Sequence, residues 1–300
     1  MGRVKKWFQD KIGIGENRDH IAEIEQKIRF NSLLINNLLP DIYNVDLKKH
    51  PIRVLKEQKL EDTISLSVHK NDLMLLIHLY KNGDFNKSLN AYYRLGHQTA
   101  ILLQDVLKEH SIQNAKSFLD FGSGYGRVTR FLPFALGKDI EVFASEVKSE
   151  AVAFNENELG FKGILHGSQA ESFPTGRQFD VIFAGSIFSH LPEKMLEEWL
   201  AKLTEVLSPN GLFLFTTHNT TLDKSLDNSI DIHYTTNSED AVLNMVSDHL
   251  SDTSEYGTTY ISDKKIDQLM GDLNLSHATK HKAFGNLQDV VVARRKEYKG

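Results

Sequence analysis

One glycine-rich segment near the middle of the chain combines an acidic residue with three regularly spaced glycines, Asp120-Phe121-Gly122-Ser123-Gly124-Tyr125-Gly126. The mostly apolar run 117–121 overlaps its start, which predicts a buried strand that turns into a helix. Glycine permits the positive φ of such a turn and lets a ligand approach the backbone N–H groups at the positive end of the helix. The segment therefore predicts a binding site for an anionic group, and Pro133 predicts that the helix is short.

This segment departs from two common nucleotide-binding motifs. No Gly-Lys-Ser or Gly-Lys-Thr follows the turn, which excludes a P-loop. The dinucleotide fingerprint Gly-x-Gly-x-x-Gly fits Gly122 and Gly124 but meets Arg127 at its third glycine. Arg127 therefore argues against an NAD-dependent dehydrogenase, which we keep as an alternative.

A second acidic residue, Glu146, ends the apolar run 140–145. A carboxylate at the tip of a strand can accept hydrogen bonds from both hydroxyls of a ribose. Dinucleotide enzymes share this feature, so Glu146 predicts a ribose-containing ligand and not one particular cofactor.

Short apolar runs alternate with helical patterns from residue 116 onward, which is typical of a parallel sheet with helices on both faces. We expect helices over 194–207 and 262–273. Strands 278–284 and 289–294 would form a hairpin around Gly285-Asn286 and make this end of the sheet antiparallel. The other expected strands are residues 117–121, 140–145, 163–166, 180–184 and 211–217.

The first part of the chain, residues 1–110, is mostly helical in its pattern, but residues 41–70 show little periodicity and one short expected strand at 64–68. Helices are expected over 18–39, over 71–80 with Asn71 as the cap, and over 89–110 with an interruption near Gly96. This region could form a lid over the ligand site, or the amphipathic helix 18–39 could join two copies in a homodimer. Residues 111–300 then form the main domain, with a polar insertion at about 219–260.

The composition excludes several kinds of site and partner. The 300 residues contain no cysteine, which removes disulfides, thiolate nucleophiles and cysteine-ligated metals and suits a cytoplasmic protein. The net charge of −5 offers nothing that attracts nucleic acid. No apolar stretch approaches the ~20 residues needed to cross a bilayer, so stable membrane insertion is not expected.

In these motifs the chain resembles the class I S-adenosylmethionine-dependent methyltransferases, whose first motif is an apolar strand ending in an acidic residue followed by x-Gly-x-Gly-x-Gly. The resemblance extends to about residue 218 and loosely to the end of the chain. It implies a Rossmann-like α/β fold with a seven-stranded, mostly parallel sheet and an antiparallel last strand, and S-adenosyl-L-methionine as the cofactor. Near its adenine-binding run the family usually has an Asp, where this chain has Gln169. The cofactor-binding residues that the resemblance implies are Asp120, Gly122, Ser123, Gly124, Glu146, Gln169, Ala170 and Ala184.

The methyl acceptor is expected beside residues 184–192. This segment lacks the Asn/Asp-Pro-Pro-Tyr/Phe motif of enzymes that methylate amino groups of adenine and glutamine, which disfavours those acceptors. His190 is the candidate general base, although a histidine here could equally pack or hydrogen-bond at the start of a helix. We therefore expect methyl transfer to a small molecule or a glycan, at a hydroxyl. A catalytically inactive homologue that binds the cofactor and acts in assembly is the other alternative.

Three further groups of residues suggest roles near the site. Phe188 or Tyr125 could face the cofactor's sulfonium through a cation–π contact. An acceptor pocket could be lined by Tyr92, Tyr93 and Arg94. No metal site is expected, because His277 and His281 fall in an expected strand, where a spacing of four residues does not converge on one ion.

Overall fold

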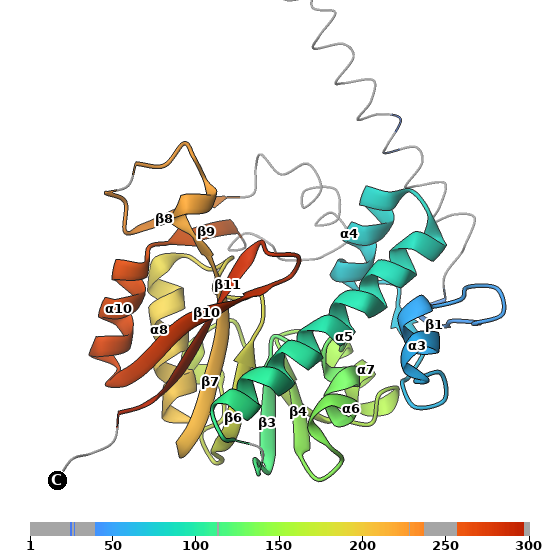
Figure 1. Ribbon diagram of the computed structural model, residues 1–300, viewed down its shortest axis with the longest axis horizontal. Coiled ribbons are helices and arrows are strands. Elements are labelled where there is room, and N and C mark those ends of the chain that lie inside the picture. Colours follow the sequence, from blue (N-terminus) through green and yellow to red (C-terminus); the bar gives the residue numbers. More distant parts are fainter. Residues whose placement is uncertain are drawn as a thin grey trace, which may run out of the picture.

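The computed structural model describes residues 25, 27, 40–112, 114–227, 229–236 and 257–296. Among these residues, seven strands lie side by side in the order β10–β11–β7–β6–β3–β4–β5 (Figure 1). Their bounds are β3 Ser117–Phe121, β4 Glu141–Glu146, β5 Lys162–Leu165, β6 Phe179–Ala184, β7 Leu207–Asn219, β10 Leu275–Ala283 and β11 Gln288–Arg295.

The strand directions create a ligand site at one edge of this sheet. β3 pairs in parallel with both β4 and β6, and β11 runs antiparallel to β7. The chain moves outward from β3 to β5 and then returns to place β6 on the other side of β3. Such a switch in direction opens a crevice at the carboxyl ends of the two strands. The predicted Rossmann-like fold with an antiparallel last strand is confirmed.

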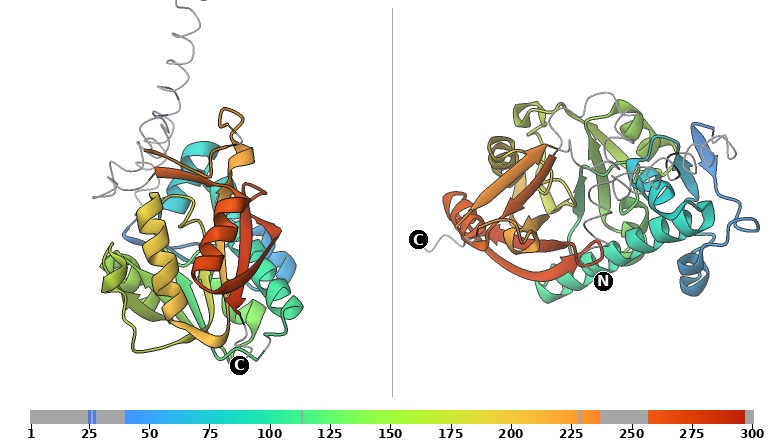
Figure 2. Two further views of the ribbon diagram at one scale, coloured as in Figure 1. Left: turned by 90° about the vertical axis from the view of Figure 1, so that its left-hand side faces the viewer. Right: turned by 90° about the horizontal axis from the view of Figure 1, so that it is seen from above.

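Two layers of helices cover the sheet because successive strand residues point to opposite faces. Phe118 and Val181 pack against α4 Leu73–Asn82, α5 Phe85–Glu109 and α6 Leu132–Leu136. On the other face, Leu119 and Ile182 pack against α8 Glu193–Glu205 and α10 Asp263–Asp272. Figure 2 shows helices on both sides of the sheet. The helix α7 Ser149–Asn157 follows β4 and packs on Tyr125 through Ala151 and Phe154.

The N-terminal region contributes α3 Arg53–Gln58, α4, α5 and a small antiparallel pair of strands, β1 Ile42–Asn44 and β2 Ser67–His69. The expected helix over 18–39, and with it the proposed homodimer contact, lies outside the described residues apart from positions 25 and 27. The expected insertion contains β8 Ile232–Thr236 and β9 Gly257–Ile261, which pair with each other and extend the end of β7. Among the described residues, no helix is long and apolar enough to cross a membrane.

Helix α5 corrects one expectation from the sequence. It runs without interruption through Gly96, because the glycine serves close packing and not a break in the helix. A Cβ atom at this position would lie 2.1 Å from the backbone oxygen of Arg127. Helix α4 also begins later than expected, since the Asp72 carboxylate accepts from the N–H groups of Met74 and Leu75 and takes the capping place predicted for Asn71.

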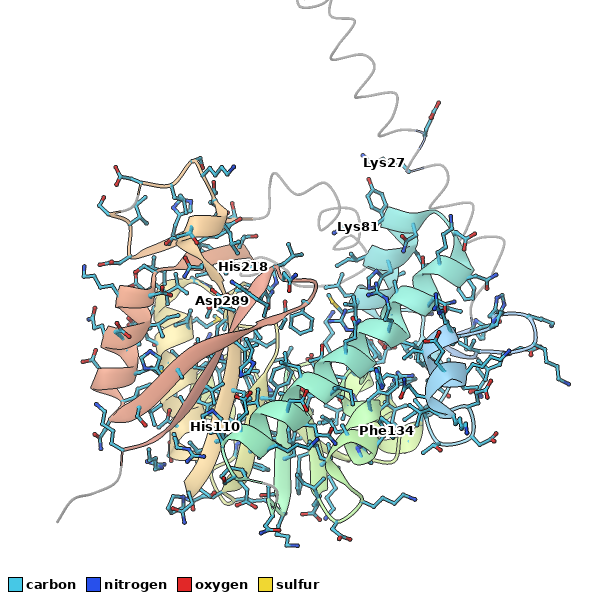
Figure 3. All side chains as sticks on the ribbon, in the orientation of Figure 1. Lys27, Lys81, His110, Phe134, His218 and Asp289 are labelled. Carbon is cyan, nitrogen blue, oxygen red and sulfur yellow. The ribbon has the colours of Figure 1, made fainter. Side chains whose placement is uncertain are left out.

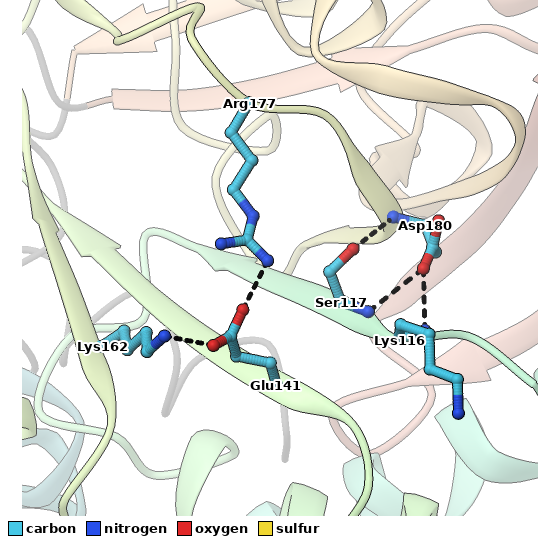
Figure 4. Close-up of polar contacts among 6 residues, drawn as sticks. All are labelled: Lys116, Ser117, Glu141, Lys162, Arg177 and Asp180. Carbon is cyan, nitrogen blue, oxygen red and sulfur yellow. Dashed lines mark hydrogen bonds and ion pairs between the residues drawn. The ribbon is translucent and has the colours of Figure 1, made fainter.

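The opposite edge of the sheet, where β3, β4 and β6 begin, is tied together by acidic residues. Asp180 accepts hydrogen bonds from the backbone N–H groups of Lys116 at 2.7 Å and Ser117 at 3.2 Å (Figure 4). Glu141 contacts both Lys162 and Arg177. These carboxylates are therefore structural and leave the other edge of the sheet for the ligand.

Candidate functional site

A cavity of about 260 Å³ lies at the carboxyl ends of β3, β4 and β6. The glycine loop after β3, the end of β4 and the segment after β6 form three of its walls, and the start of α4 forms the fourth. Its main lining residues are Asn71, Asp72, Leu73, Met74, Asp120, Gly122, Ser123, Gly124, Tyr125, Arg127, Glu146, Val147, Lys148, Gly185, Ser186, Ile187 and Phe284. Six of the eight predicted cofactor residues lie in or next to this cavity: Asp120, Gly122, Ser123, Gly124 and Glu146 line it, and Ala184 directly precedes Gly185.

The glycines of the loop adopt a backbone that only glycine takes without strain. Gly122, Gly124 and Gly126 have φ of +69°, +55° and +70°. A Cβ at Gly122 would lie 2.2 Å from Cδ1 of Ile187, whereas Gly124 has open space around it. The loop is anchored by Asn155, whose Nδ2 donates to the Gly124 oxygen at 2.8 Å. At Gly124, the backbone itself therefore forms part of the cavity wall, with no side chain in the way of a ligand.

Asp120 is a buried carboxyl at the floor of the cavity, only 3% exposed. Thr129 Oγ1 donates to its Oδ2 at 2.6 Å. Burial raises the pKa of Asp120 to about 6, because the charged form loses hydration, while the Thr129 hydrogen bond and the charge of Arg127 oppose the shift. A carboxylate held in such surroundings is well suited to a cationic group of a ligand.

The shifted pKa of Asp120 predicts how stability depends on pH. Because this pKa is higher in the folded than in the unfolded protein, the folded state binds the proton more tightly. This proton binding stabilises the folded state at low pH, and the stabilisation is lost as the pH rises through about 6. The free energy of unfolding of the wild type, relative to Asp120→Asn, should therefore fall by about 2 kcal/mol between pH 4.5 and 7.5. Urea denaturation of both proteins at several pH values measures this difference, and a constant difference would refute the assignment.

Glu146 stands at the tip of β4 and is half-buried. Its Oε1 accepts from the N–H of Gly124 at 3.1 Å and its Oε2 from the N–H of Val147 at 2.8 Å. Burial raises the pKa of Glu146, and these backbone hydrogen bonds oppose the shift. A carboxylate has about four acceptor positions, so these backbone hydrogen bonds leave room for a hydroxyl group of a ligand. Val147, 48% exposed, adds an apolar surface beside them.

Two predicted residues lie outside the cavity lining. Gln169 is exposed and precedes the short turn Ala170–Ser172, where Ala170 is buried. This turn follows β5, and the neighbouring His166 donates its backbone N–H to the Glu146 oxygen at 3.2 Å. Gln169 and Ala170 are therefore near the Glu146 end of the site, and their contact with a cofactor stays a prediction.

His190 is oriented by the start of β9, near the end of the insertion. Its Nδ1 lies 2.8 Å from the Gly257 oxygen, which can only accept, so Nδ1 carries the proton. The Nε2 atom then faces Ser186 Oγ at 3.3 Å as an acceptor. His190 does not line the cavity, but Ser186 does, with a φ of +60°. The cavity therefore reaches His190 through a serine hydroxyl.

Gln288, from the start of β11, holds this serine in place. Thr216 Oγ1 accepts from the Ser186 N–H at 2.7 Å and donates to Gln288 Oε1 at 2.5 Å. The Gln288 amide then donates to the hydroxyls of Ser186 at 2.9 Å and Ser189 at 3.1 Å. His218, whose pKa is lowered by burial, lies on the same edge of the sheet as Asp289 (Figure 3). The Gln288 amide therefore joins Thr216, Ser186 and Ser189 in one hydrogen-bonded cluster.

The sequence did not single out Ser186, Gln288 or Asp72. Ser186 lies four residues before His190, in the segment expected to meet the acceptor, so its place in the chain was a usable signal. Gln288 comes from a distant strand, and no local pattern marks it. Asp72 caps α4 in the place predicted for Asn71, and its position at the cavity follows only from the packing of α4.

Several aromatic residues have other roles than expected. Tyr92 and Tyr93 are fully buried, and Arg94 bonds to Gln98 on the exposed side of α5, so these three residues do not line the cavity. Phe188 is also fully buried and packs on Phe213 and Phe215 in the core. The three rings do not line the cavity because they are packed in the helical layer and the core, whereas Arg94 lies on the exposed side of α5.

Tyr125 does line the cavity, but neighbouring side chains fix its ring. The ring stacks on that of His69 with centroids 4.5 Å apart, and its hydroxyl donates to Glu150 at 2.7 Å. His277 lies 3.1 Å from Asp267 and His281 lies 3.3 Å from Glu109, so the two histidines have separate partners. Within the described part of the chain, no group of three or more His, Asp or Glu side chains could hold a metal ion.

Comparison with known proteins identifies the segment that carries this site. Residues 119–213 match the family model described as a methyltransferase domain. An N-terminal Xaa-Pro-Lys N-methyltransferase 1 of Xenopus tropicalis is 29% identical over 118 residues, which cover 38% of this chain and 51% of that protein. A malonyl-[acyl-carrier protein] O-methyltransferase of Halalkalibacterium halodurans is 28% identical over 145 residues, covering 44% and 52%. The chain thus spans about half the length of these relatives.

Among solved structures, a magnesium protoporphyrin IX methyltransferase of Synechocystis is similar with a TM-score of 0.48 and 16% identity, over 69% of this chain and 87% of that one. The family model covers the glycine loop, Glu146 and the segment after β6, which form three of the four walls of the cavity. The segment that forms most of the cavity is therefore a methyltransferase domain, as the sequence motifs predict.

Proposed function

We propose that the protein binds S-adenosyl-L-methionine in this cavity and transfers its methyl group to an acceptor. The observation that carries the proposal is the convergence of Asp120, the glycine loop and Glu146 on one cavity inside the matched domain. Asp120 and Arg127 offer opposite charges for the amino and carboxylate groups of the methionyl part. Glu146 has acceptor positions for the ribose hydroxyls, and Val147 offers an apolar surface for adenine. The residues present therefore fit the cofactor.

The acceptor we propose is a hydroxyl of a small molecule or a glycan. When bound, the cofactor supplies an electrophilic methyl group on a sulfonium. The protein's own contribution is to hold the two reactants in line, which can lower the barrier by up to ~7–11 kcal/mol. Ser186 Oγ at the cavity wall can accept the hydroxyl proton while its own proton passes to His190 Nε2, whose tautomer is set by Gly257.

A thermal-shift titration with S-adenosylhomocysteine, S-adenosylmethionine and NAD⁺ in parallel tests the proposed cofactor. A ligand at 100 times its Kd stabilises the folded protein by about 2.7 kcal/mol, which shifts the Tm by several degrees. We expect saturable shifts with the two sulfur nucleotides and none with NAD⁺. A shift with NAD⁺ alone would support a dehydrogenase instead. Binding of the sulfur nucleotides without transfer to any acceptor would favour the inactive assembly protein.

The two ends of strand β4 offer a matched pair of variants. Glu146→Gln removes the charge and one acceptor at the cavity, so affinity for S-adenosylhomocysteine should fall by about 10- to 100-fold. Glu141→Gln changes the same residue type at the opposite end of β4, where it contacts Lys162 and Arg177. This control should bind as the wild type does. Equal affinities of the two variants would place the cofactor elsewhere.

A further inference from the structure

The side chain of Arg130 joins the glycine loop to the N-terminal region. It belongs to the short helical turn Thr129–Phe131 and is only 3% exposed. Its Nε donates to the Gly126 oxygen at 2.9 Å, and one terminal nitrogen donates to the Tyr125 oxygen at 3.0 Å. Gly126 has a φ of +70°, and this left-handed backbone conformation sets the direction of the carbonyl that Arg130 contacts.

The other side of the guanidinium faces segments that precede the main domain. One terminal nitrogen donates to the backbone oxygens of Ser65 at 3.0 Å and Ser67 at 2.9 Å. The hydroxyls of Tyr93 and Tyr92 lie 3.3 and 3.4 Å from the two terminal nitrogens. The planar fork of arginine can reach all these acceptors at once, which the single ammonium of lysine cannot do.

Tyr92 connects this buried cation to a buried carboxylate. Its hydroxyl donates to Asp72 Oδ2 at 2.6 Å, and Asp72 is 2% exposed. The other oxygen of Asp72 caps α4 through the N–H groups of Met74 and Leu75. Asp72, Leu73 and Met74 line the cavity opposite the glycine loop. One chain of hydrogen bonds therefore runs from the loop, through Arg130 and Tyr92, to the helix start across the cavity.

We propose that Arg130 is a positioning residue that makes the shape of the cofactor loop depend on the docking of residues 65–93. The inference rests on the proposed function, since it concerns the same cavity. Arg130 does not line the cavity itself and acts through the carbonyls of Tyr125 and Gly126 and through the Tyr92–Asp72 pair. The N-terminal region thereby becomes part of the cofactor site, because loss of its contacts frees the loop.

Arg130→Lys, Tyr92→Phe and a control variant test this proposal in the full chain. Arg295→Lys is the control, because Arg295 also donates to two backbone oxygens, those of Thr204 and Leu207, at a place remote from the cavity. Affinity for S-adenosylhomocysteine, measured by calorimetry, should fall at least about tenfold in Arg130→Lys, less in Tyr92→Phe, and not in the control.

Hydrogen exchange of the ligand-free proteins tests the coupling of the two segments without relying on cofactor binding. In Arg130→Lys and Tyr92→Phe, exchange of the amides of residues 122–126 and 71–75 should rise together. A rise on only one side of the cavity, or an unchanged affinity with both segments protected, would overturn the coupling. If Arg130→Lys does not fold, the affinity for S-adenosylhomocysteine and the amide exchange of Tyr92→Phe test the proposal instead. Failure of the wild type to bind S-adenosylhomocysteine would count against the proposed function, while the exchange of the two segments would still decide the coupling.

Discussion

Gly96→Ala is expected to lower the free energy of unfolding by about 2–3 kcal/mol and to weaken cofactor binding as well. The new Cβ would lie 2.1 Å from the Arg127 oxygen, and a backbone atom cannot move aside as a flexible side chain can. Relief of this clash requires α5 and the residues after the glycine loop to move apart. Arg127 lines the cavity, so the displacement reaches the cofactor site. Urea denaturation and calorimetric titration with S-adenosylhomocysteine measure the two effects.

A second helical glycine provides the matched control for this prediction. Gly271 lies inside α10 with no atom near the place of a Cβ and with an ordinary helical φ. Gly271→Ala should therefore raise the free energy of unfolding by about 0.5–1 kcal/mol, because alanine has less backbone entropy to lose. A Gly96→Ala protein as stable as the wild type would show that α5 does not pack on the loop as described.

His190→Gln is expected to lower kcat for a hydroxyl acceptor by about 10²- to 10⁴-fold, the range that a general base contributes. Glutamine can still donate to the Gly257 oxygen but cannot take a proton. Affinity for S-adenosylhomocysteine should stay unchanged, because His190 does not line the cavity. Transfer of a tritiated methyl group from S-adenosylmethionine to a panel of hydroxylated small molecules, glycans and peptides with free N-termini identifies a substrate for this measurement.

Two further variants show whether the loss is specific to proton transfer. Ser186→Ala removes the hydroxyl between the cavity and His190 and should also lower kcat. His277→Gln is the control: this histidine lies on β10 and contacts Asp267 of α10, so its replacement should leave kcat unchanged. A His190→Gln enzyme that retains full kcat would show that the histidine has only a structural role. Transfer to amino groups alone would contradict the proposed hydroxyl acceptor.

The main domain was predictable because its signals are local. Strand β3 has the expected bounds, Ser117–Phe121, and all five of its residues are buried. A short apolar run that ends at a glycine turn is a local signal for such a strand. Asp120 and Glu146 fall at the carboxyl ends of neighbouring parallel strands, so their convergence follows from the topology. The mostly parallel sheet and its antiparallel last strand were likewise expected from the alternating pattern and the final hairpin together with the family resemblance.

The contribution of the N-terminal region could not be predicted, because it depends on contacts between distant segments. Gly96 reads as a helix interruption until α5 is seen to touch Arg127. Tyr92 and Tyr93 resemble ligand-binding aromatics in the sequence, but their hydroxyls face Arg130 from a distant part of the chain. The start of α4 forms a cavity wall for the same reason. The roles of these residues depend on tertiary packing, which produces no periodicity or motif in the sequence.

The most direct test of the cofactor site compares hydrogen exchange of the wild type with and without S-adenosylhomocysteine. Binding in the cavity should protect the amides of residues 122–127 and 146–148, where the ligand meets the loop and the end of β4, and those of residues 71–74 at the start of α4. The opposite edge of the sheet, around Lys116, Glu141 and Asp180, should exchange as before. Protection confined to other segments, or no protection at saturating ligand, would contradict the site.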